Sequence, residues 1–220
     1  MSQNFVINIL TDKTSWMNRY DKKLKDILSS KGHIINIVYS KYSLKEADIS
    51  FLLSCFEIID KEFLKLSKHN IVVHASDLPK GKGWSPSSWQ ILEGQNDIPI
   101  SLFEATNEID AGDIYIKDKI SLQGYELIDK WQDILGNKIV SMCCNFVDNY
   151  PSILNQKTKQ NGEESFYRRR SPKDSQLDIN KSIKEQFNLF RIVDNNKYPA
   201  YFDFNGHRYI LKIFEEKNVE

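Results

Sequence analysis

Residues 70–94, NIVVHASDLPKGKGWSPSSWQILEG, join an apolar segment to an amphipathic one through a polar loop. The opening residues NIVVH form a short β-rich run that ends at His74. Prolines and glycines then mark a turn-rich loop. Ser85 suits the N-cap of a helix, Pro86 its first position and Gly94 its end. The stretch therefore predicts a strand, a loop and a helix, with His74 at the carboxyl end of the strand.

Strand-like and helix-like segments alternate on both sides of this stretch. Apolar β-rich runs predict strands, and apolar residues at steps of three and four predict helices. The expected strands are residues 5–10, 33–39, 49–54, 70–74, 98–105 and 113–120, and the expected helices are 17–32, 60–68, 86–94 and 128–146. This alternation predicts an α/β fold, a mostly parallel Rossmann-like sheet flanked by helices. Ligands of such sheets bind at the carboxyl ends of the strands, where His74 is expected to lie.

Composition divides the chain into three parts. We expect a catalytic domain over residues 1–150, a polar linker over 151–165, and a small C-terminal α+β domain over 166–220. The last part offers a helix at 181–194 and a terminal hairpin that turns at Asn205-Gly206. We expect the hairpin to cover the sheet or to form the interface of a homodimer.

Charge and cysteine content limit the kinds of binding partner that we expect. The 30 basic and 30 acidic residues cancel, whereas proteins that bind nucleic acid usually carry a basic excess. The apolar runs are far shorter than the roughly 20 residues of a membrane span. Three cysteines without CxxC spacing indicate neither disulfides nor a metal site. We therefore expect a cytoplasmic protein with no nucleic-acid or membrane partner and no metal.

Two polar features fit a proton-handling site. One is His74, and the other is Asp110, which Gly112 follows in EIDAGDI. A carboxylate beside a histidine orients the ring and stabilises its cationic form. The helix start near Pro86 adds backbone N–H groups, which suit a developing negative charge. A histidine that merely ends a strand and an ordinary turn at DAG would explain the same residues.

The motifs HASDLPKGKGWSPSSWQILEG and IPISLFEATNEIDAGDIYI resemble the N10-formyltetrahydrofolate-dependent formyltransferase family. The shared pattern is a His-x-Ser-x-Leu-Pro loop, a Pro-x-x-Trp helix ending in Gly and a later Asp-x-Gly turn, over residues 48–120. Further along, residues 166–192 resemble the start of the small C-terminal domain in members that act on nucleotide-linked amino sugars or on methionyl-tRNA.

The resemblance implies roles for the polar pair. His74 would take the proton of an attacking amine, and Asp110 would stabilise the imidazolium. The family carries an Asn two residues before this His, where the present chain has Val72. That Asn donates a hydrogen bond to the oxyanion. Asn70, on the same face of the strand by alternation, is the candidate replacement.

The resemblance also implies N10-formyltetrahydrofolate as co-substrate, without a metal. Its expected contacts are Leu53, Ser54, Phe56, Asp77, Leu78, Ile109 and Gly112.

The acceptor implied is the amine of a UDP- or dTDP-linked amino-dideoxy sugar, as in surface polysaccharide biosynthesis and pseudaminic-acid-type pathways. Cations for its pyrophosphate and an aromatic ring for its base are expected at Lys80, Lys82, Trp84, Arg168, Arg169 and Arg170. The alternatives are a methionyl-tRNA formyltransferase-like enzyme, an inactive folate- or nucleotide-binding homologue, and an enzyme that discharges the formyl group to water.

Overall fold

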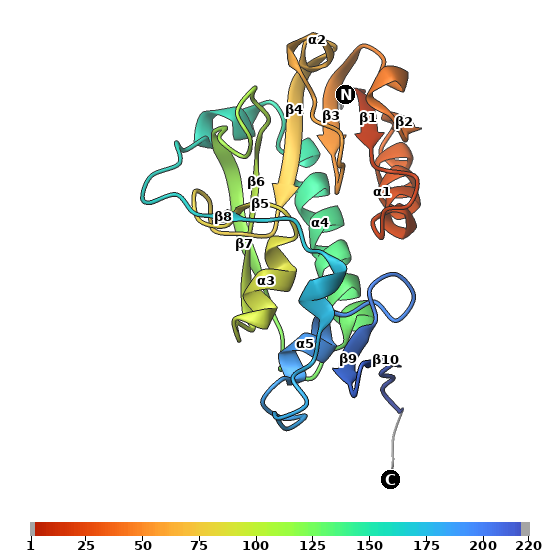
Figure 1. Ribbon diagram of the computed structural model, residues 1–220. Helices are drawn as coiled ribbons and strands as arrows, with labels where there is room; N and C mark the ends of the chain where they lie inside the picture. The colour runs from red at the N-terminus through yellow and green to blue at the C-terminus, as the bar shows by residue number, and fades with distance from the viewer. Residues whose placement is uncertain (1–2, 217–220) are drawn as a thin grey trace.

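A six-stranded sheet forms the centre of the computed structural model, which describes residues 3–216 (Figure 1). The strands run in the order β2-β1-β3-β4-β6-β7. They are β1 (Val6–Leu10), β2 (Ile34–Val38), β3 (Ala47–Leu52), β4 (Ser67–His74), β6 (Asp97–Glu104) and β7 (Ile114–Ser121). Strands β2, β1, β3 and β4 are parallel to one another, whereas β6 pairs antiparallel with both β4 and β7. The sheet is therefore mixed and mostly parallel, which confirms the α/β prediction.

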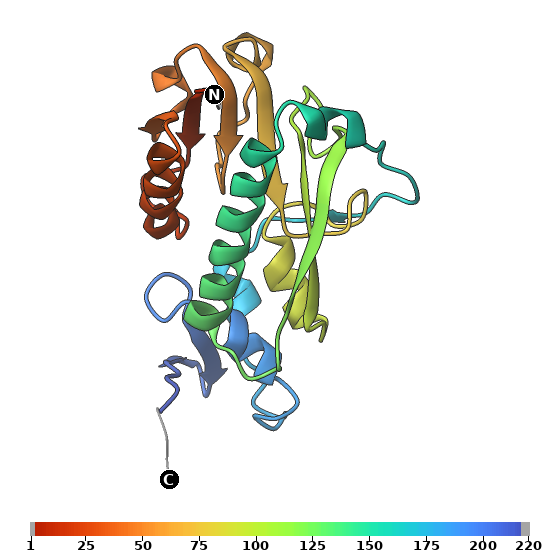
Figure 2. The same ribbon diagram turned by 180° about the vertical axis from the view of Figure 1, so that it is seen from behind.

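Two helices, α1 (Asn18–Ser30) and α4 (Ile128–Asp148), lie side by side on one face of the sheet (Figure 2). The Tyr20 hydroxyl of α1 donates to Asp133 of α4 over 2.7 Å. The Tyr20 ring lies against Gly136, where a Cβ would come within 2.4 Å of it. The apolar stripe of α4 faces the sheet, as its three- and four-residue spacing predicts. None of the helices within residues 3–216 is long and apolar enough to cross a membrane.

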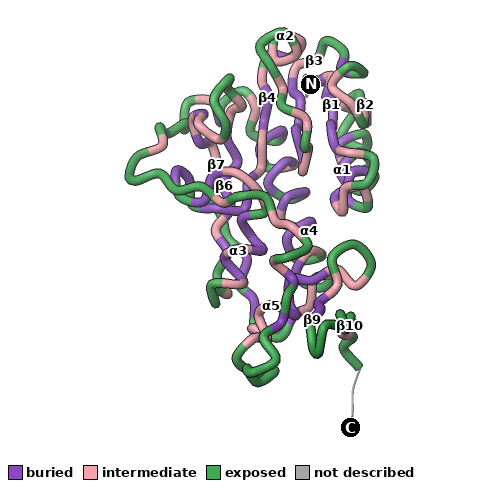
Figure 3. The backbone as a smooth tube through the Cα atoms, viewed as in Figure 1, coloured by how far each residue is buried: buried purple, intermediate pink, exposed green. Residues whose placement is uncertain are grey.

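The connection after β4 contains β5 (Lys82–Gly83) and α3 (Pro86–Leu92). The segment expected to be a linker begins with the short helix η2 (Ser152–Gln156) and continues into β8 (Phe166–Tyr167), which pairs in parallel with β5. We call residues 157–167 the strap. It is mostly exposed and crosses in front of the sheet beside β5 (Figures 1 and 3). The strap thus contacts the loop that follows His74.

The chain after the strap packs on the same core as the sheet. It contains η3 (Pro172–Ser175), α5 (Phe187–Ile192) and the hairpin of β9 (Ala200–Phe204) and β10 (His207–Leu211). Apolar side chains of α5 and β9 belong to the core cluster that the sheet, α1 and α4 share. The Trp131 indole of α4 donates to the Arg191 carbonyl over 2.8 Å. This contact ties α4 to the C-terminal part.

Two expected helices are shorter in the structure. Helix α5 covers only six residues of 181–194, because side chains such as Asp178 and Ser182 bond nearby backbone groups and favour turns. Helix α2 (Lys61–Leu64) ends early because β4 begins at Ser67, whose hydroxyl pairs with that of Ser50 at 2.6 Å. The remaining element is the short helix η1 (Lys41–Ser43).

Candidate active site

A cavity of about 470 Å³ opens at the carboxyl ends of β3 and β4. Its walls come from five parts of the chain: Trp16 just before α1, the end of β3 with the loop after it, the end of β4 with residues 83–88, the end of β6 with the loop before β7, and the first part of α4. Both His74 and Asp110 line it. The topology thus brings the predicted pair to the edge of the sheet where α/β proteins bind ligands.

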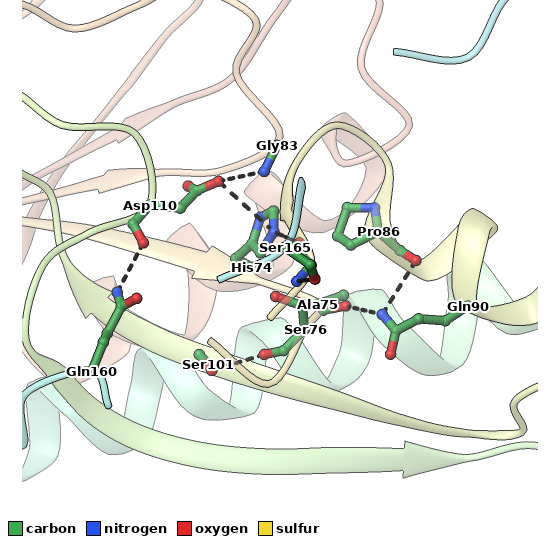
Figure 4. A network of polar contacts seen from close by, with 11 residues as sticks. His74, Ala75, Ser76, Gly83, Pro86, Gln90, Ser101, Asp110, Gln160 and Ser165 are labelled. Carbon is green, nitrogen blue, oxygen red and sulfur yellow. Dashed lines mark hydrogen bonds and ion pairs between the residues drawn. The ribbon is translucent and has the colours of Figure 1, made fainter. Parts of the chain in front are cut away.

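The two nitrogens of the His74 ring differ in their contacts. Its Nε2 lies 2.8 Å from the Gly81 carbonyl oxygen (Figure 4). Because a carbonyl only accepts hydrogen bonds, Nε2 carries the proton and donates it to Gly81. Within residues 3–216 the Nδ1 atom makes no hydrogen bond. With the proton on Nε2, the Nδ1 atom carries the lone pair of the ring.

Asp110 lies beside the bonded side of this ring. Its Oδ2 is 3.9 Å from His74 Nε2 and accepts the Gly83 backbone N–H over 2.9 Å. Asp110 has φ of +50°, a left-handed conformation that aspartate tolerates better than most residues. The carboxylate and the ring are thus within ion-pair distance of each other. The predicted convergence of His74 and Asp110 is present in the structure.

The strap holds both loops of the site, through residues that sequence reasoning missed. The Gln160 side-chain amide donates to the Asp110 carbonyl over 2.8 Å (Figure 4). It also donates to the Gly112 carbonyl over 2.9 Å. The Ser165 hydroxyl accepts the Gly81 N–H over 2.9 Å. A glutamine and a serine in a polar stretch give no sequence signal of this kind. The segment expected to be a linker therefore positions the site.

Four of the predicted folate contacts line the cavity, and three do not. The lining ones are Leu53, Ser54, Phe56 and Ile109. Asp77 is paired with Lys117 at 2.6 Å, and Leu78 is buried in the core. Gly112 lies so close to the Glu104 carbonyl that a Cβ would sit 1.6 Å from its oxygen. Close backbone packing explains this glycine without a ligand.

Asn70 lies away from the cavity, so the structure does not support it as the replacement amide. Its Nδ2 donates to the Leu64 carbonyl over 2.8 Å, beside α2. Asn70 and His74 do lie on the same face of β4, as strand alternation predicts. However, Asn70 lies two residues before Val72, which lines the cavity, and so is further from the carboxyl end of the strand. Two other amide side chains do line it, Asn107 and Gln132.

The lysines and arginines predicted to bind the acceptor have different partners in the structure. The Lys82 ammonium is buried and lies 2.5 Å from Glu164, so it points into the strap and not into the cavity. Arg168 pairs with Asp174, and Arg170 donates to the Ile192 carbonyl over 2.9 Å. Arg169 lies against the rings of Phe56 and Trp84, which both line the cavity. Lys80 is exposed on the surface of the loop.

No cluster of three or more His, Cys, Asp or Glu side chains that could hold a metal ion occurs within the described part of the chain.

Comparison with known proteins places the chain in a family. Residues 7–136, more than half of the sequence, match the family model for formyl transferases. The chain belongs to the formyl transferase family. This confirms the resemblance inferred from the two motifs.

The relatives differ in the acceptors that their names give. The methionyl-tRNA formyltransferase of Mycoplasma capricolum is 27% identical over 80% of this chain and 57% of its own length. This chain therefore spans little more than half of that relative. A solved methionyl-tRNA formyltransferase from Clostridium thermocellum is 25% identical, with a TM-score of 0.77 over 98% of this chain and 95% of that one. A 4-N formyltransferase from Francisella tularensis shares the fold, with a TM-score of 0.74, 18% identity, and coverage of 97% and 99%.

Proposed function

We propose that the chain is an N-formyltransferase that moves the formyl group of N10-formyltetrahydrofolate to the amine of a nucleotide-linked amino sugar. The single observation that carries the transfer chemistry is the His74–Asp110 pair at the cavity, in a chain of the formyl transferase family. The cavity wall also fits a flat, largely apolar ring system, because Leu53, Val72 and Phe103 contribute to it.

In this proposal each group of the pair has one task. The co-substrate supplies the formyl carbon. His74 Nδ1 accepts the proton that the acceptor amine loses as its nitrogen bonds to that carbon, and then returns a proton to N10 as the old C–N bond breaks. Asp110 offsets the positive charge of the ring between these steps, and the Gly83 N–H keeps the carboxylate in place.

The formyl oxygen needs a hydrogen-bond donor, since it gains negative charge during the attack. Val72 cannot donate. We infer that Asn107 supplies this bond, because it lines the cavity on the same loop as Asp110, three residues earlier, and makes no side-chain hydrogen bond within residues 3–216. Gln132 lines the α4 side of the cavity and is better placed for the acceptor.

Charge favours a nucleotide sugar over tRNA as acceptor. The chain has a formal net charge of zero, whereas tRNA binding is driven largely by basic surfaces. The methionyl-tRNA formyltransferases among the relatives support the second candidate, transfer to methionyl-tRNA. Val72 supports the third, a homologue that binds folate or a nucleotide without catalysis. A homodimer and a cytoplasmic location stay predictions.

One experiment separates these candidates. The protein is incubated with N10-formyltetrahydrofolate and, in separate reactions, UDP- and dTDP-linked 3-amino and 4-amino sugars, methionyl-tRNA, or buffer alone. Mass spectrometry follows the acceptors, and a formate assay follows discharge to water. The proposal predicts a formylated sugar nucleotide and an unchanged methionyl-tRNA. Formylated methionyl-tRNA, formate from the buffer reaction alone, or no product at all would each reject the sugar assignment.

A further inference from the structure

Two aromatic rings stack on each other at the cavity. Phe56 comes from the loop after β3 and Trp84 from the residue that follows β5. Their ring centroids are 5.5 Å apart and their planes differ by 22°. Both line the cavity, yet Phe56 is 50% exposed. An exposed aromatic side chain at a cavity often marks a binding surface.

A guanidinium without a counter-charge lies against these rings. The Arg169 guanidinium carbon is 5.3 Å from the Phe56 centroid and 5.1 Å from that of Trp84. Within residues 3–216 its side chain makes no ion pair and no hydrogen bond. The preceding residue, Arg168, instead forms an ion pair with Asp174. Arg169 therefore keeps its full set of donors for a molecule outside the protein.

This trio has the chemistry to recognise a planar ring that carries an anionic group. Aromatic faces stack on a flat ring, and the planar fork of arginine binds a phosphate or carboxylate through two parallel bonds. Arginine that already rests on an aromatic face also loses less freedom when it binds. The rings come from two loops and the cation from the chain beyond the strap, so the three meet only in the folded protein.

We propose that Phe56, Trp84 and Arg169 form a subsite for an aromatic ring with an attached anion, and that its occupant is the nucleoside diphosphate of the acceptor. The choice of occupant rests on the function proposed above. The benzoylglutamate part of the folate has the same chemistry, an aromatic ring followed by carboxylates, and is the other source of such a ligand.

Calorimetry with the unmodified chain and three variants tests the subsite. UDP and dTDP are titrated without any formyl donor into the wild type, Arg169→Ala, Trp84→Ala and Arg208→Ala. Arg208 is the matched control, because it too lies on an aromatic ring, that of Tyr201, but on the β9–β10 hairpin. We expect Arg169→Ala to weaken nucleotide binding by about 10- to 100-fold, the usual worth of a charged hydrogen-bonded contact. Arg208→Ala should bind as the wild type does.

A second titration identifies the source of the ligand. Tetrahydrofolate and its analogue without the glutamate, tetrahydropteroate, replace the nucleotides. Arg169→Ala could weaken the binding of tetrahydrofolate but not that of UDP or dTDP, while the wild type and the variant bind tetrahydropteroate equally well. In that case the subsite stands and its occupant is the folate tail. If Arg169→Ala and Trp84→Ala change neither nucleotide nor folate binding, the subsite is rejected.

Formyl transfer, measured separately, keeps this result apart from the proposed function. Loss of nucleotide binding in Arg169→Ala, in a protein that formylates no sugar, would retain the subsite and reject the function. Sugar formylation, together with unchanged nucleotide and folate binding in every variant, would retain the function and reject the subsite. Because Arg169 is exposed, its replacement should leave folding intact, and Arg169→Lys gives a second variant that keeps the charge but lacks the fork.

Discussion

Gly83 donates its backbone N–H to the Asp110 carboxylate over 2.9 Å, although the two residues lie 27 positions apart on different loops. The bond fixes the acid beside His74. It depends on a glycine, because Gly83 has φ of +93° and a Cβ there would meet the Tyr167 carbonyl oxygen at 2.5 Å. The pairing of β5 with β8 thus connects the strap to the geometry of the His74–Asp110 pair.

Gln160 is a positioning residue for Asp110. Replacing it by Ala removes two hydrogen bonds to the 110–112 turn, so kcat should fall by about tenfold or more while KM for the acceptor changes little. Lys159→Ala, an exposed strap position, is the control. A purely structural role would lower thermal stability and leave kcat of the folded protein unchanged.

Asn107→Ala tests the donor to the formyl oxygen. Loss of one such donor typically lowers kcat by about 10²–10³-fold. Gln132→Ala is the comparison, because its amide lines the same cavity from α4 and should act mainly on KM for the acceptor. Steady-state kinetics of the two variants measure both effects. A kcat loss in Gln132→Ala with wild-type kcat in Asn107→Ala would reverse the assignment.

The sequence patterns predicted the sheet and the approach of His74 to Asp110, but not the contacts among the loops. Apolar runs and turn residues determine where strands end, and parallel strands bring those ends to one edge. His74 and Asp110 could be placed from that alone. Lys82 could not, because a lysine in a polar loop looks the same whether it faces a ligand or Glu164. Lys82 meets Glu164 of the strap, and Phe56 and Trp84 meet Arg169 of the chain beyond the strap. No local periodicity shows where such segments pack.

Lys82 should contribute to stability and not to nucleotide binding. Glu164→Gln leaves the buried ammonium without its counter-charge and should lower the free energy of unfolding by about 2–3 kcal/mol. Lys82→Met removes the charge itself, so the loss should be smaller, about 1 kcal/mol. Chemical denaturation measures both values, and calorimetry should give wild-type UDP affinity for Lys82→Met. A weaker UDP affinity in Lys82→Met would instead indicate that Lys82 contacts the nucleotide.

Asp21 makes stability depend on pH. Burial raises the pKa of its carboxyl from 3.8 to about 6, and the Thr11 hydroxyl is its one hydrogen-bond donor within residues 3–216. The folded state therefore holds this proton more tightly than the unfolded state does. The contribution of Asp21 to stability should be complete below about pH 4 and be lost as pH rises through 6, a loss of at most about 3 kcal/mol. In Asp21→Asn this fall should be absent from denaturation curves at pH 4 and pH 7. An equal fall in the variant and the wild type would contradict the assignment.

The central claim is that His74 acts as the base in formyl transfer to an amino sugar. Its most direct measurement is kcat/KM for a nucleotide-linked amino sugar in the wild type and in His74→Asn, with N10-formyltetrahydrofolate as donor. We predict a formylated sugar nucleotide from the wild type and a kcat/KM lower by about 10²–10⁴-fold in the variant, with tetrahydrofolate binding retained. A variant that transfers the formyl group at the wild-type rate would contradict the claim.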